Sequence, residues 1–518
     1  MKVSRKLLAL AIVGMLAALA LFVGCSSSSS SSSSTSGSQA SASGSAASSA
    51  QADDSIVIGC SFIAGNLNPV DSAWDLTAHG ISEGVYMQDA QGNLVSRFVS
   101  DLTRKDDLTW EAKLTNQVKF SDGTDCDAQA LAGCLNYLQK NNEMTNGTAG
   151  VVTFTVVDDD TLEIVTTKPT PVMQSLLCEW CNVVFKQDGD NFIYTGPYMV
   201  KELDSDVSIA LEPNPYYDDK AANRPNVLLK VFKDAATMQQ AFQSGEIDIM
   251  FGLTPEVAKT LEAEGFTVKA FDAGYQYFAF ANVASGPMAD ENVRQAVNMI
   301  INRDDMVTAL NGGSVASGIF AHYYSFAGDV QEKTDVDAAA SLLEAAGYTK
   351  NDKGIYEKDG QPLQVKLTTY SARADLPILM QLASSELTEA GIECSTEVVD
   401  DINTVLEGGA YDVVLYAQHT APSGEPSAFL NMALAPGGSR NYANYENSEI
   451  NDLLDQMGKT EPGADRDKLS KDIQAIVAED LPIIYLVDPQ WHVALSDRVS
   501  DYEPYCGDYY VVNAQLGL

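Results

Sequence analysis

The pattern of apolar and polar positions changes its period along the chain, and each period predicts a different element. In residues 110–120 the apolar and polar side chains alternate, which is typical of a half-buried strand. Residues 152–157 and 161–167 are both rich in strand-forming residues and flank three aspartates, 158–160, so they predict a β-hairpin. The aspartates lack the spacing of a calcium loop, which needs a glycine and a distal glutamate. We therefore interpret them as the turn of the hairpin.

Helical spacing dominates the second half of the chain. Residues 291–310 place five apolar side chains on one face, namely Val293, Ala296, Val297, Ile300 and Ile301. Residues 450–457 and 469–477 repeat this pattern. Strand-like segments at 362–370 and 411–418 alternate with these helices. Alternation of this kind predicts an α/β fold class.

The N-terminus has the layout of a secretory signal. Lys2, Arg5 and Lys6 precede an almost entirely apolar run, 7–23, which is too short to favour a permanent membrane span. The stretch that ends at Cys25, "LFVGC", resembles the lipobox of bacterial lipoproteins. In those proteins the cysteine is acylated and becomes the new N-terminus. The alternative is a plain signal peptide in which the cysteine is incidental.

A serine-rich segment follows Cys25 and predicts a flexible tether. Residues 26–54 consist mainly of Ser, Gly and Ala and contain no aromatic residue. Such a segment cannot bury enough apolar area to offset its chain entropy. Acyl chains on Cys25 would hold the protein on the outer face of the cell membrane, and the tether would let the folded body stand away from it.

Composition adds one constraint, because the chain is strongly acidic. It carries 71 Asp and Glu against 32 Lys and Arg, a formal charge of −39. Cleavage before Cys25 would remove three positive charges and change this value from −39 to −42. A chain of this charge repels phosphate backbones, so nucleic-acid binding is excluded. The charge favours solubility outside the cell but identifies no ligand.

The cysteines offer one motif with possible chemistry. Besides Cys25 there are seven, an odd number, which leaves at least one free thiol in a monomer. Cys178 and Cys181 form a C-x-x-C, but it ends an apolar stretch instead of opening a helix after a strand, and no second pair completes a zinc site. We interpret the pair as a local disulfide or two buried thiols. An exported thiol oxidoreductase is the alternative from a different functional class.

Five motifs occur in the order found in one protein family. They are "VKFSDGT" (118–124), "TGPYMV" (195–200), "EPNPYYDDKAANRPNV" (212–227), "SGEIDIM" (244–250) and "DENVRQAVNMIINRDDM" (290–306). Together they resemble the family 5 solute-binding proteins of ABC importers, which include oligopeptide-, dipeptide- and nickel-binding proteins. The resemblance covers residues 55–518. A lipobox at the N-terminus is consistent with the same role.

The resemblance implies a two-lobed α/β fold, periplasmic-binding-protein type II-like, with an extra inserted subdomain. We expect lobe I at 55–85, 191–277 and 483–518, the insert at 86–190, and lobe II at 278–482. The chain is expected to cross between lobes near 277–283 and 481–487, where apolar strand-like segments suit a hinge. Cys60 and Cys506 would then share lobe I and could pair.

The implied function is capture of a peptide or peptide-like solute between the lobes and its delivery to an ABC permease. In this family a separate ATPase subunit hydrolyses ATP, so we expect no cofactor and no enzymatic activity in this chain, which should be a monomer. The motifs G-x-S-x-G, H-E-x-x-H and G-x-x-x-x-G-K-[ST] do not occur. Ligand would favour the closed state by contacting both lobes.

Residues 417–434 resemble the peptide-binding members most closely. In those members an aromatic residue and then an aspartate precede the matching segment, and the aspartate pairs with the peptide's amino group. Here His419 occupies the aromatic place and Pro422 the aspartate place. Glu425 is the nearest carboxylate. Either Glu425 binds the amine, or the ligand has no free α-amine at this point.

The remaining candidate ligand contacts are aromatic. Tyr277 lies near a predicted crossing, Trp74 in the loop after the first strand, and Trp180 in the insert. Aromatic faces suit varied ligands because burial against them is non-directional, although each residue could equally be core. The alternative solute is nickel or another metal chelate, which family members hold through aromatic, Arg and His side chains. Residues 434–442 contain no His, and residues 176–184 contain no Arg.

Overall fold

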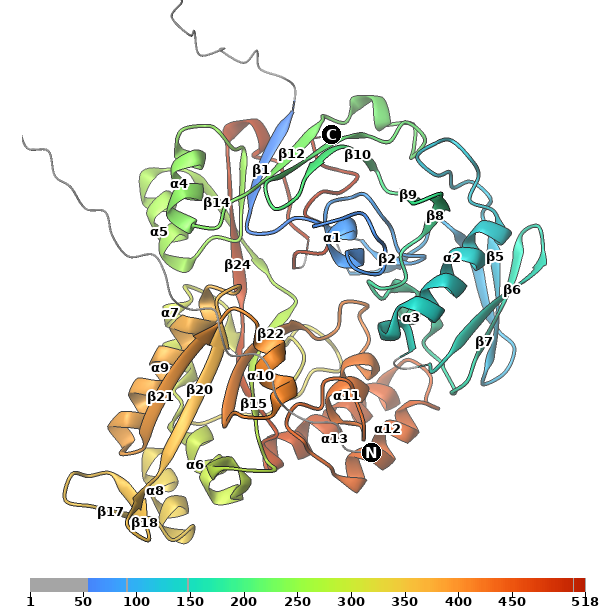
Figure 1. Cartoon of the computed structure of the whole chain (residues 1–518). Coiled ribbons are helices and arrows are strands. Elements are labelled where there is room, and N and C mark those ends of the chain that lie inside the picture. Colours follow the sequence, from blue (N-terminus) through green and yellow to red (C-terminus); the bar gives the residue numbers. More distant parts are fainter. Residues whose placement is uncertain (1–54, 90–91, 147–148, 506, 518) are drawn as a thin grey trace, which may run out of the picture. The chain divides into compact units, whose positions relative to one another are not determined.

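The computed structural model describes residues 55–89, 92–146, 149–505 and 507–517 (Figure 1). The predicted signal segment, the lipidation site Cys25, the serine-rich tether and Cys506 lie outside the described residues. Within the described part of the chain, no helix is both long and apolar enough to cross a bilayer. Residues 54–518 form one unit of contacts, which holds two large sheets and several smaller ones.

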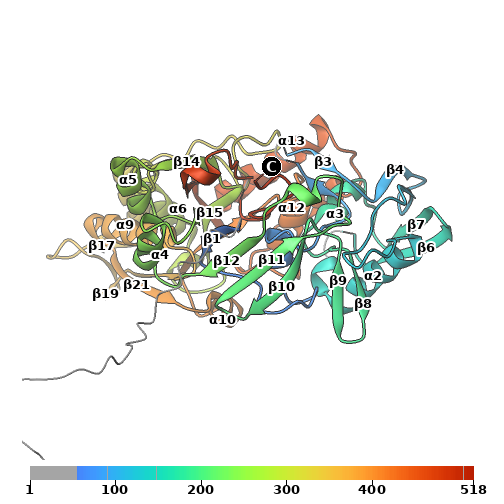
Figure 2. The same cartoon turned by 90° about the horizontal axis from the view of Figure 1, so that it is seen from above.

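The first large sheet has seven strands in the order β10-β11-β12-β1-β13-β24-β14. Their bounds are β1 Ile56–Cys60, β10 Tyr198–Asp204, β11 Ser208–Pro213, β12 Val227–Val231, β13 Ile249–Phe251, β14 Thr267–Asp272 and β24 Gln490–Leu495. Figure 2 shows β10, β11 and β12 side by side. Strand β1 pairs in parallel with both β12 and β13, and the last strand, β24, enters antiparallel between β13 and β14.

Two helices, α4 (Ala235–Gln243) and α5 (Pro255–Glu264), cover one face of this sheet. The Asp234 side chain caps α4 by accepting from the Thr237 amide, and Thr254 caps α5 by accepting from the Val257 amide. Gly265 ends α5 in a left-handed conformation, φ +92°, which a glycine adopts without steric cost. The other face belongs to a larger core that also contains α1 (Ala73–Ala78).

The second large sheet has six strands in the order β16-β23-β15-β22-β20-β21. Their bounds are β15 Tyr275–Ala281, β16 Ser314–Val315, β20 Gln364–Tyr370, β21 Glu393–Val399, β22 Val413–His419 and β23 Ile483–Asp488. Both faces are covered, so β15 is apolar except for the buried Gln276: Tyr277 and Ala279 face one core, while Phe278 and Phe280 face the other.

Helices fill both faces of the second sheet. On one side lie α6 (Glu291–Ile300), α7 (Arg303–Ala309), α8 (Val336–Ala345) and α9 (Asp375–Ala390). On the other lie α10 (Ile402–Gly408), α11 (Ser427–Leu434), α12 (Ser448–Met457) and α13 (Ala464–Asp480). All five apolar residues predicted in 291–310 are buried in the first of these cores, but the single helical face is confirmed only as far as Ile300. The helix ends there, Ile301 takes an extended conformation, and α7 starts at Arg303. A small sheet of β17 (Thr349–Lys350), β18 (Tyr356–Lys358) and β19 (Gln361–Pro362) follows α8.

The segment between α1 and β10 carries a four-stranded sheet of its own, β4-β5-β7-β6. Its elements are β4 Val99–Arg104, β5 Thr109–Leu114, α2 Ala128–Asn141, β6 Val152–Asp158, β7 Thr161–Thr166 and α3 Met173–Cys178. Two hairpins flank it, β2 (Met87–Gln88) with β3 (Leu94–Val95), and β8 (Phe185–Asp188) with β9 (Asn191–Tyr194).

The predicted hairpin at 152–167 is confirmed, because β6 and β7 pair antiparallel around the aspartate turn. The predicted strand at 110–120 is too long. Strand β5 buries Trp110, Ala112 and Leu114 on one face but ends at Leu114. Asn116 then takes a left-handed φ of +53°, which is incompatible with an extended strand and turns the chain.

Two connections join the large sheets, and they lie side by side. The chain leaves β14 at Asp272 and starts β15 at Tyr275; it leaves β23 at Asp488 and starts β24 at Gln490. The Ala273 amide donates to the Pro489 carbonyl at 3.3 Å, so the connections touch. The segments 277–283 and 481–487, which we expected to make the crossings, lie mostly inside β15 and β23.

Candidate functional site

Aromatic rings form a continuous row that joins the two large sheets. Phe62, just after β1, stacks on Trp74 of α1 with ring centroids 4.7 Å apart, and Trp74 meets Tyr509 edge-on at 6.3 Å. Tyr509 in turn meets His419, the last residue of β22, at 5.2 Å. His419 lies 5.7 Å from Tyr275, the first residue of β15. We call these five residues the aromatic row.

A single arginine, Arg373, packs against the Tyr275 end of the row. The Arg373 guanidinium lies over the rings of Tyr275, at 4.5 Å, and Trp491, at 5.0 Å. It donates to the Asp508 carboxylate at 3.1 Å, and the Tyr275 hydroxyl donates to the other Asp508 oxygen at 3.0 Å. Asp508 comes from the C-terminal segment, and Arg373 precedes α9. This ion pair therefore ties segments from the two sheets together.

Three buried polar atoms along and beside the row have no hydrogen-bond partner among the described residues. They are Nε1 of Trp74, Nδ1 of His79 and Nδ1 of His419. His79 lies at the end of α1, 6.0 Å from the Phe62 ring. Burial lowers the pKa of both histidines to about 3, so both rings are neutral at physiological pH. Buried polar atoms are normally paired, so these three mark a place where a bound molecule would supply partners.

Two carboxyl groups near the row have raised pKa values. Burial, with a smaller contribution from Asp508, raises the pKa of Asp75 to about 6. Burial also raises the pKa of Glu179 to about 7, and the neighbouring Glu425 adds to the shift. The Ser423 hydroxyl donates to Glu179 at 2.7 Å, which joins the segment after α3 to the segment before α11. Carboxyl groups of this kind readily gain a cationic partner.

One arginine near the row has no acidic partner. Arg440 donates to Oε1 of Gln418 at 2.6 Å and to the Tyr416 hydroxyl at 3.2 Å, both of which are neutral. No ion pair within 4.0 Å involves Arg440 among the residues that the structure describes. The site therefore offers one cationic side chain and at least one acidic side chain to a solute.

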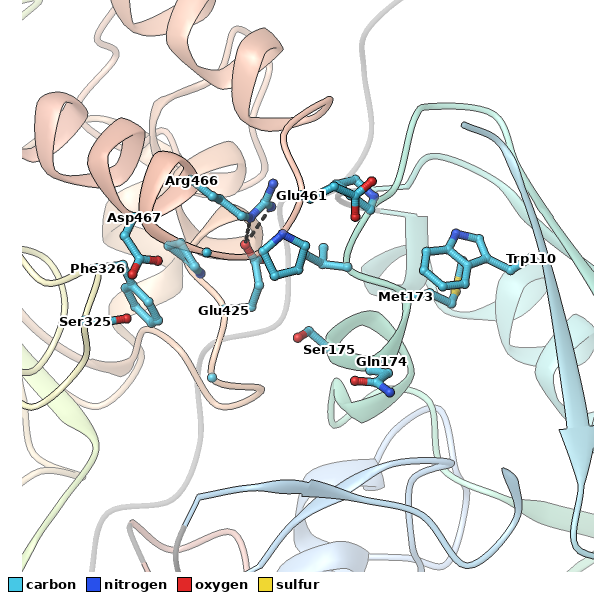
Figure 3. A pocket seen from close by; sticks show the side chains of 16 residues that line it. Trp110, Met173, Gln174, Ser175, Ser325, Phe326, Glu425, Glu461, Arg466 and Asp467 are labelled. Atoms are coloured by element: carbon cyan, nitrogen blue, oxygen red, sulfur yellow. Dashed lines mark hydrogen bonds and ion pairs between the residues drawn. The ribbon is translucent and has the colours of Figure 1, made fainter. Parts of the chain in front are cut away.

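Glu425, predicted as a ligand contact, is already fully engaged (Figure 3). Its Oε1 accepts from Nε and Nη2 of Arg466 at 2.8 and 2.6 Å, and its Oε2 accepts from the Ser427 amide at 2.9 Å. Both partners are almost completely buried, with 8% of the Glu425 side chain and 3% of the Arg466 side chain exposed. The pair fastens the start of α11 to α13, which is a structural role.

A cavity of about 480 Å³ lies beside this ion pair, between α3 and the start of α13 (Figure 3). Trp110, Met173, Phe326 and Glu461 contribute to its lining. A smaller cavity of about 50 Å³ adjoins it and is lined by Glu179 and the predicted residue Trp180. The larger cavity has the volume of a small ligand, but its buried charges are already paired. Three unpartnered buried atoms instead lie in or beside the aromatic row, on Trp74, His419 and His79, and we therefore take the row as the candidate site.

The five predicted ligand contacts do not all meet. Trp74 and His419 come together through Tyr509 in the aromatic row. Trp180 and Glu425 line the smaller cavity. Tyr277 is fully buried behind the row: its hydroxyl donates to Asp375 at 2.6 Å and accepts from Nε1 of Trp491 at 2.9 Å.

Sequence reasoning missed several residues of the site, including Glu179, Arg440, Asp508 and Tyr509. Glu179 stands between the two cysteines of the C-x-x-C and beside the predicted contact Trp180, but a single glutamate there matches none of the motifs that predict a ligand contact. Arg440 lies in the segment examined for a missing histidine. Asp508 and Tyr509 follow Cys506 near the end of the chain, and no local pattern marks them.

The thiols do not favour redox chemistry. Cys178 and Cys181 are free and buried, and burial raises the pKa of each thiol well above its usual value, which disfavours the reactive thiolate. Cys60 is also free; the partner suggested for it, Cys506, is outside the described residues. In the described part of the chain, no group of three or more His, Cys, Asp and Glu residues could hold a metal ion.

Comparison with known proteins finds relatives that are similar along most of the chain. The relatives include the nickel-binding protein NikA of Staphylococcus aureus, 23% identical over 433 residues, with 82% of this chain and 86% of NikA covered. They also include the glutathione-binding protein GsiB of Escherichia coli O157:H7, 24% identical over 478 residues, with 85% and 89% covered.

Two solved structures share the fold. NikA from Staphylococcus aureus in complex with Ni(L-His)2 superposes with a TM-score of 0.78 at 21% identity, covering 89% of this chain and 99% of NikA. The oligopeptide-binding protein AppA from Bacillus subtilis in complex with a nonapeptide gives 0.73 at 18% identity, covering 88% and 96%. The fold is thus that of type II periplasmic binding proteins, as predicted.

A family model gives the assignment. The model of the bacterial extracellular solute-binding proteins, family 5, matches residues 93–441, which is more than half of the chain. The match includes Glu179, His419 and Arg440. The chain therefore belongs to the bacterial extracellular solute-binding proteins, family 5.

Proposed function

We propose that this protein is a lipid-anchored, extracytoplasmic receptor that captures a peptide or peptide-like solute and delivers it to an ABC permease. The family consists of solute-binding proteins of transporters and not of enzymes. We further propose two lobes, one built on each large sheet, with residues 86–190 as an inserted subdomain. Solute bound at the aromatic row would bridge the lobes and favour the closed arrangement.

The observation that carries the proposal is the set of unpartnered buried atoms on Trp74, His79 and His419. Each would cost free energy in a protein that never bound a ligand, because a buried donor or acceptor without a partner loses its hydration. A peptide offers amide donors and acceptors at close spacing and could satisfy all three. The aromatic faces of the row would take its side chains with little geometric demand.

A metal chelate is the second candidate, and the neutral histidines favour it. A metal binds the unprotonated nitrogen of a neutral imidazole, and burial, which lowers the pKa of His419 and His79 to about 3, keeps both rings neutral without a deprotonation step. Relatives named as nickel-binding support this candidate. One histidine from the protein would complete a chelate whose other ligands came with the solute.

Ligand-induced thermal stabilisation distinguishes the candidates. We expect a pool of mixed tripeptides to raise the melting temperature of the folded body, residues 54–518, in a concentration-dependent way. Free amino acids, nickel with histidine, and haem would be run in parallel. A rise with nickel and histidine alone would replace the peptide assignment by the chelate. No rise with any of these solutes would remove the support for both.

The lipid anchor is tested separately on the full-length chain. In a bacterial host grown with a labelled fatty acid, the wild-type chain should carry label and sediment with membranes. Cys25→Ser should lose the label and appear in the soluble extracytoplasmic fraction. An unlabelled wild-type chain would favour the plain signal peptide.

A further inference from the structure

A cavity of about 290 Å³ lies against the two connections between the large sheets, and we call it the linker cavity. Asp272, the last residue of β14, and Gln490, the first of β24, line it from the first sheet. From the second sheet come Asp488, the last residue of β23, and Ser314, the first of β16. Tyr275 is the one residue of the aromatic row that lines it. The linker cavity is therefore a different place from the rest of the candidate site.

Two glycines let the loop before β16 pack directly on one connection. Gly313 has a φ of +91°, and a Cβ on it would lie 2.3 Å from the Asp488 carbonyl oxygen. Gly312 has a φ of +152°, and a Cβ on it would lie 2.9 Å from Oε1 of Gln490. Glycine alone tolerates both this backbone conformation and this approach. One wall of the linker cavity is therefore fixed to the backbone of the connection itself.

The Asp488 carboxylate has one oxygen without a partner. Only 5% of this side chain is exposed. Its Oδ2 accepts from the His322 amide at 2.8 Å and lies 3.0 Å from Nδ1 of the same histidine, whereas its Oδ1 has no hydrogen-bond partner among the described residues. Gln276 lies beside this carboxylate, but its Nε2 donates to the Tyr275 carbonyl at 3.0 Å and its own Oε1 is unpartnered. Two buried acceptors therefore lack a donor here.

The linker cavity also lacks a permanent positive charge. No lysine or arginine is among the described residues that line it. His322 is its one basic side chain, and that ring, 53% exposed, is charged only when protonated. Asp272 adds a second carboxylate, which accepts from Nε2 of Gln490 at 3.4 Å. A cation with hydrogen-bond donors would supply both the missing charge and the missing donor.

A primary ammonium group fits these requirements better than a metal ion. Among the residues that the structure describes, no group of three or more His, Cys, Asp and Glu could hold a metal. An ammonium group brings three donors that rotate to meet the acceptors available. The cavity is several times larger than a water molecule, and the rings of Tyr275 and Tyr323 on its wall offer apolar faces to a short alkyl chain.

We propose that the linker cavity binds a small primary amine in its ammonium form. Asp488 is its main anchor, through Oδ1, and Asp272 is a second, exposed anchor. Because these two residues end strands of different sheets, the bound amine joins the sheets beside their connections. In the two-lobe arrangement it would favour one angle between the lobes and so change the affinity for solute. That consequence rests on the proposed function, whereas the site itself does not.

Thermal unfolding of residues 54–518 without solute tests the site. The probes are methylammonium and propylammonium chloride, and the controls are tetramethylammonium and sodium chloride at equal ionic strength, because these carry the charge without an N–H donor. We expect a saturable rise in melting temperature with the primary amines, and a half-maximal rise that needs at least about tenfold more tetramethylammonium. Equal effects of all four salts would overturn the proposal, as would stabilisation by magnesium chloride alone.

Variants identify the anchors. Asp488→Asn keeps the shape of the side chain but removes its charge, so half-maximal stabilisation should need about tenfold to a hundredfold more amine. Asp272→Asn alters an exposed residue and should need about twofold to fivefold more, and it serves as the test if Asp488→Asn does not fold. Glu163→Gln should respond as wild type, because Glu163 is an exposed acid on β7, which does not line the cavity. An unchanged response in a folded Asp488→Asn would overturn the proposal.

The histidines of the chain, four in all, report where the amine binds. In protein with ¹⁵N-labelled histidine, the amine should move the ring signals of His322, which lines the linker cavity, more than those of His419 in the aromatic row. The signals of His322 are assigned by their loss in His322→Gln. If the amine moves His419 and leaves His322 in place, it binds at the row and the proposal is wrong. A peptide pool that moves neither ring would instead count against the proposed function and leave the amine site standing.

Discussion

Glu179 should make the ligand-free protein less stable in alkaline solution, and Glu179→Gln should remove that effect. Burial raises the pKa of this carboxyl from 4.5 to about 7, so the fold disfavours its ionised form. A carboxyl whose pKa is raised on folding contributes stability that is fully present below its unfolded pKa and is lost as the pH rises through its folded pKa. The affected window therefore runs from about pH 4.5 to about pH 7.

The size of the effect follows from the shift. At about 1.4 kcal/mol for each pKa unit, ionising Glu179 in the folded protein would cost at most roughly 3.5 kcal/mol above the window. The side chain is only half-buried, and solvent that reaches it screens part of this cost, so we expect about 1–2 kcal/mol. Gln keeps an oxygen that can accept from Ser423, so the substitution removes the charge and little else.

Urea unfolding of residues 54–518 at pH 5 and pH 8.5 measures this effect without ligand. We expect Glu179→Gln to match the wild type within about 0.5 kcal/mol at pH 5 and to exceed its free energy of unfolding by about 1–2 kcal/mol at pH 8.5. Glu163→Gln should show no such difference between the two pH values. A Glu179→Gln protein that is less stable than wild type at pH 8.5, or equally altered at both, would refute the reasoning.

Three further predictions concern the surroundings of the site. Glu425→Gln should lower the free energy of unfolding by about 2–4 kcal/mol in urea, since it leaves Arg466 buried without a counter-charge, and an unchanged value would contradict the structural role of the pair. Asp508→Asn should cost about 1–3 kcal/mol in the same assay, because the partly exposed Arg373 loses its counter-ion; a loss no larger than for Glu163→Gln would argue against the tie between the sheets. Cys178 and Cys181 should react with a thiol reagent at pH 8 only after unfolding, as peptide mapping would reveal, because burial raises the pKa of both thiols; rapid labelling of the native protein would revive the oxidoreductase alternative.

The sequence predicted elements well where one periodicity ran uninterrupted. The helix at 291–300 and the hairpin at 152–167 both follow from side-chain spacing alone, since each has one buried and one exposed face. Strand β5 was predicted too long because the alternation continued past Leu114, whereas the left-handed backbone of Asn116 ended the strand. Backbone conformation at one residue is not visible in a hydrophobic pattern.

The crossings between the sheets were harder to place for a different reason. Strand β15 is buried on both faces, so its sequence is apolar except for Gln276, and no run of polar residues marks the end at which the chain changes sheets. The chain changes sheets before Tyr275, at the short segment Ala273–Gly274, and not at the predicted segment 277–283, which begins inside β15.

The candidate site was only partly predictable, because its residues come from distant segments. His419 and Trp74 were singled out by resemblance and by residue type, and both lie in the aromatic row. Arg440 and Tyr509 reach the row from a loop and from the C-terminal segment, and neither has a neighbour in the sequence that points to this place. Glu425 was identified by its charge, but only the fold brings Arg466 to it, 41 positions further along the chain.

Tyr275 has a place in the fold with a mechanical consequence. It contacts His419 and Asp508 through its ring and hydroxyl, and it is the first residue of β15, directly after the glycine that links the sheets. In the proposed two-lobe arrangement, a solute that displaced this ring would also move the backbone beside the linker, because no residue lies between them. Binding at the aromatic row and rotation about the linker would then be coupled within a single residue, and a permease on the outside would sense bound solute from the angle between the lobes.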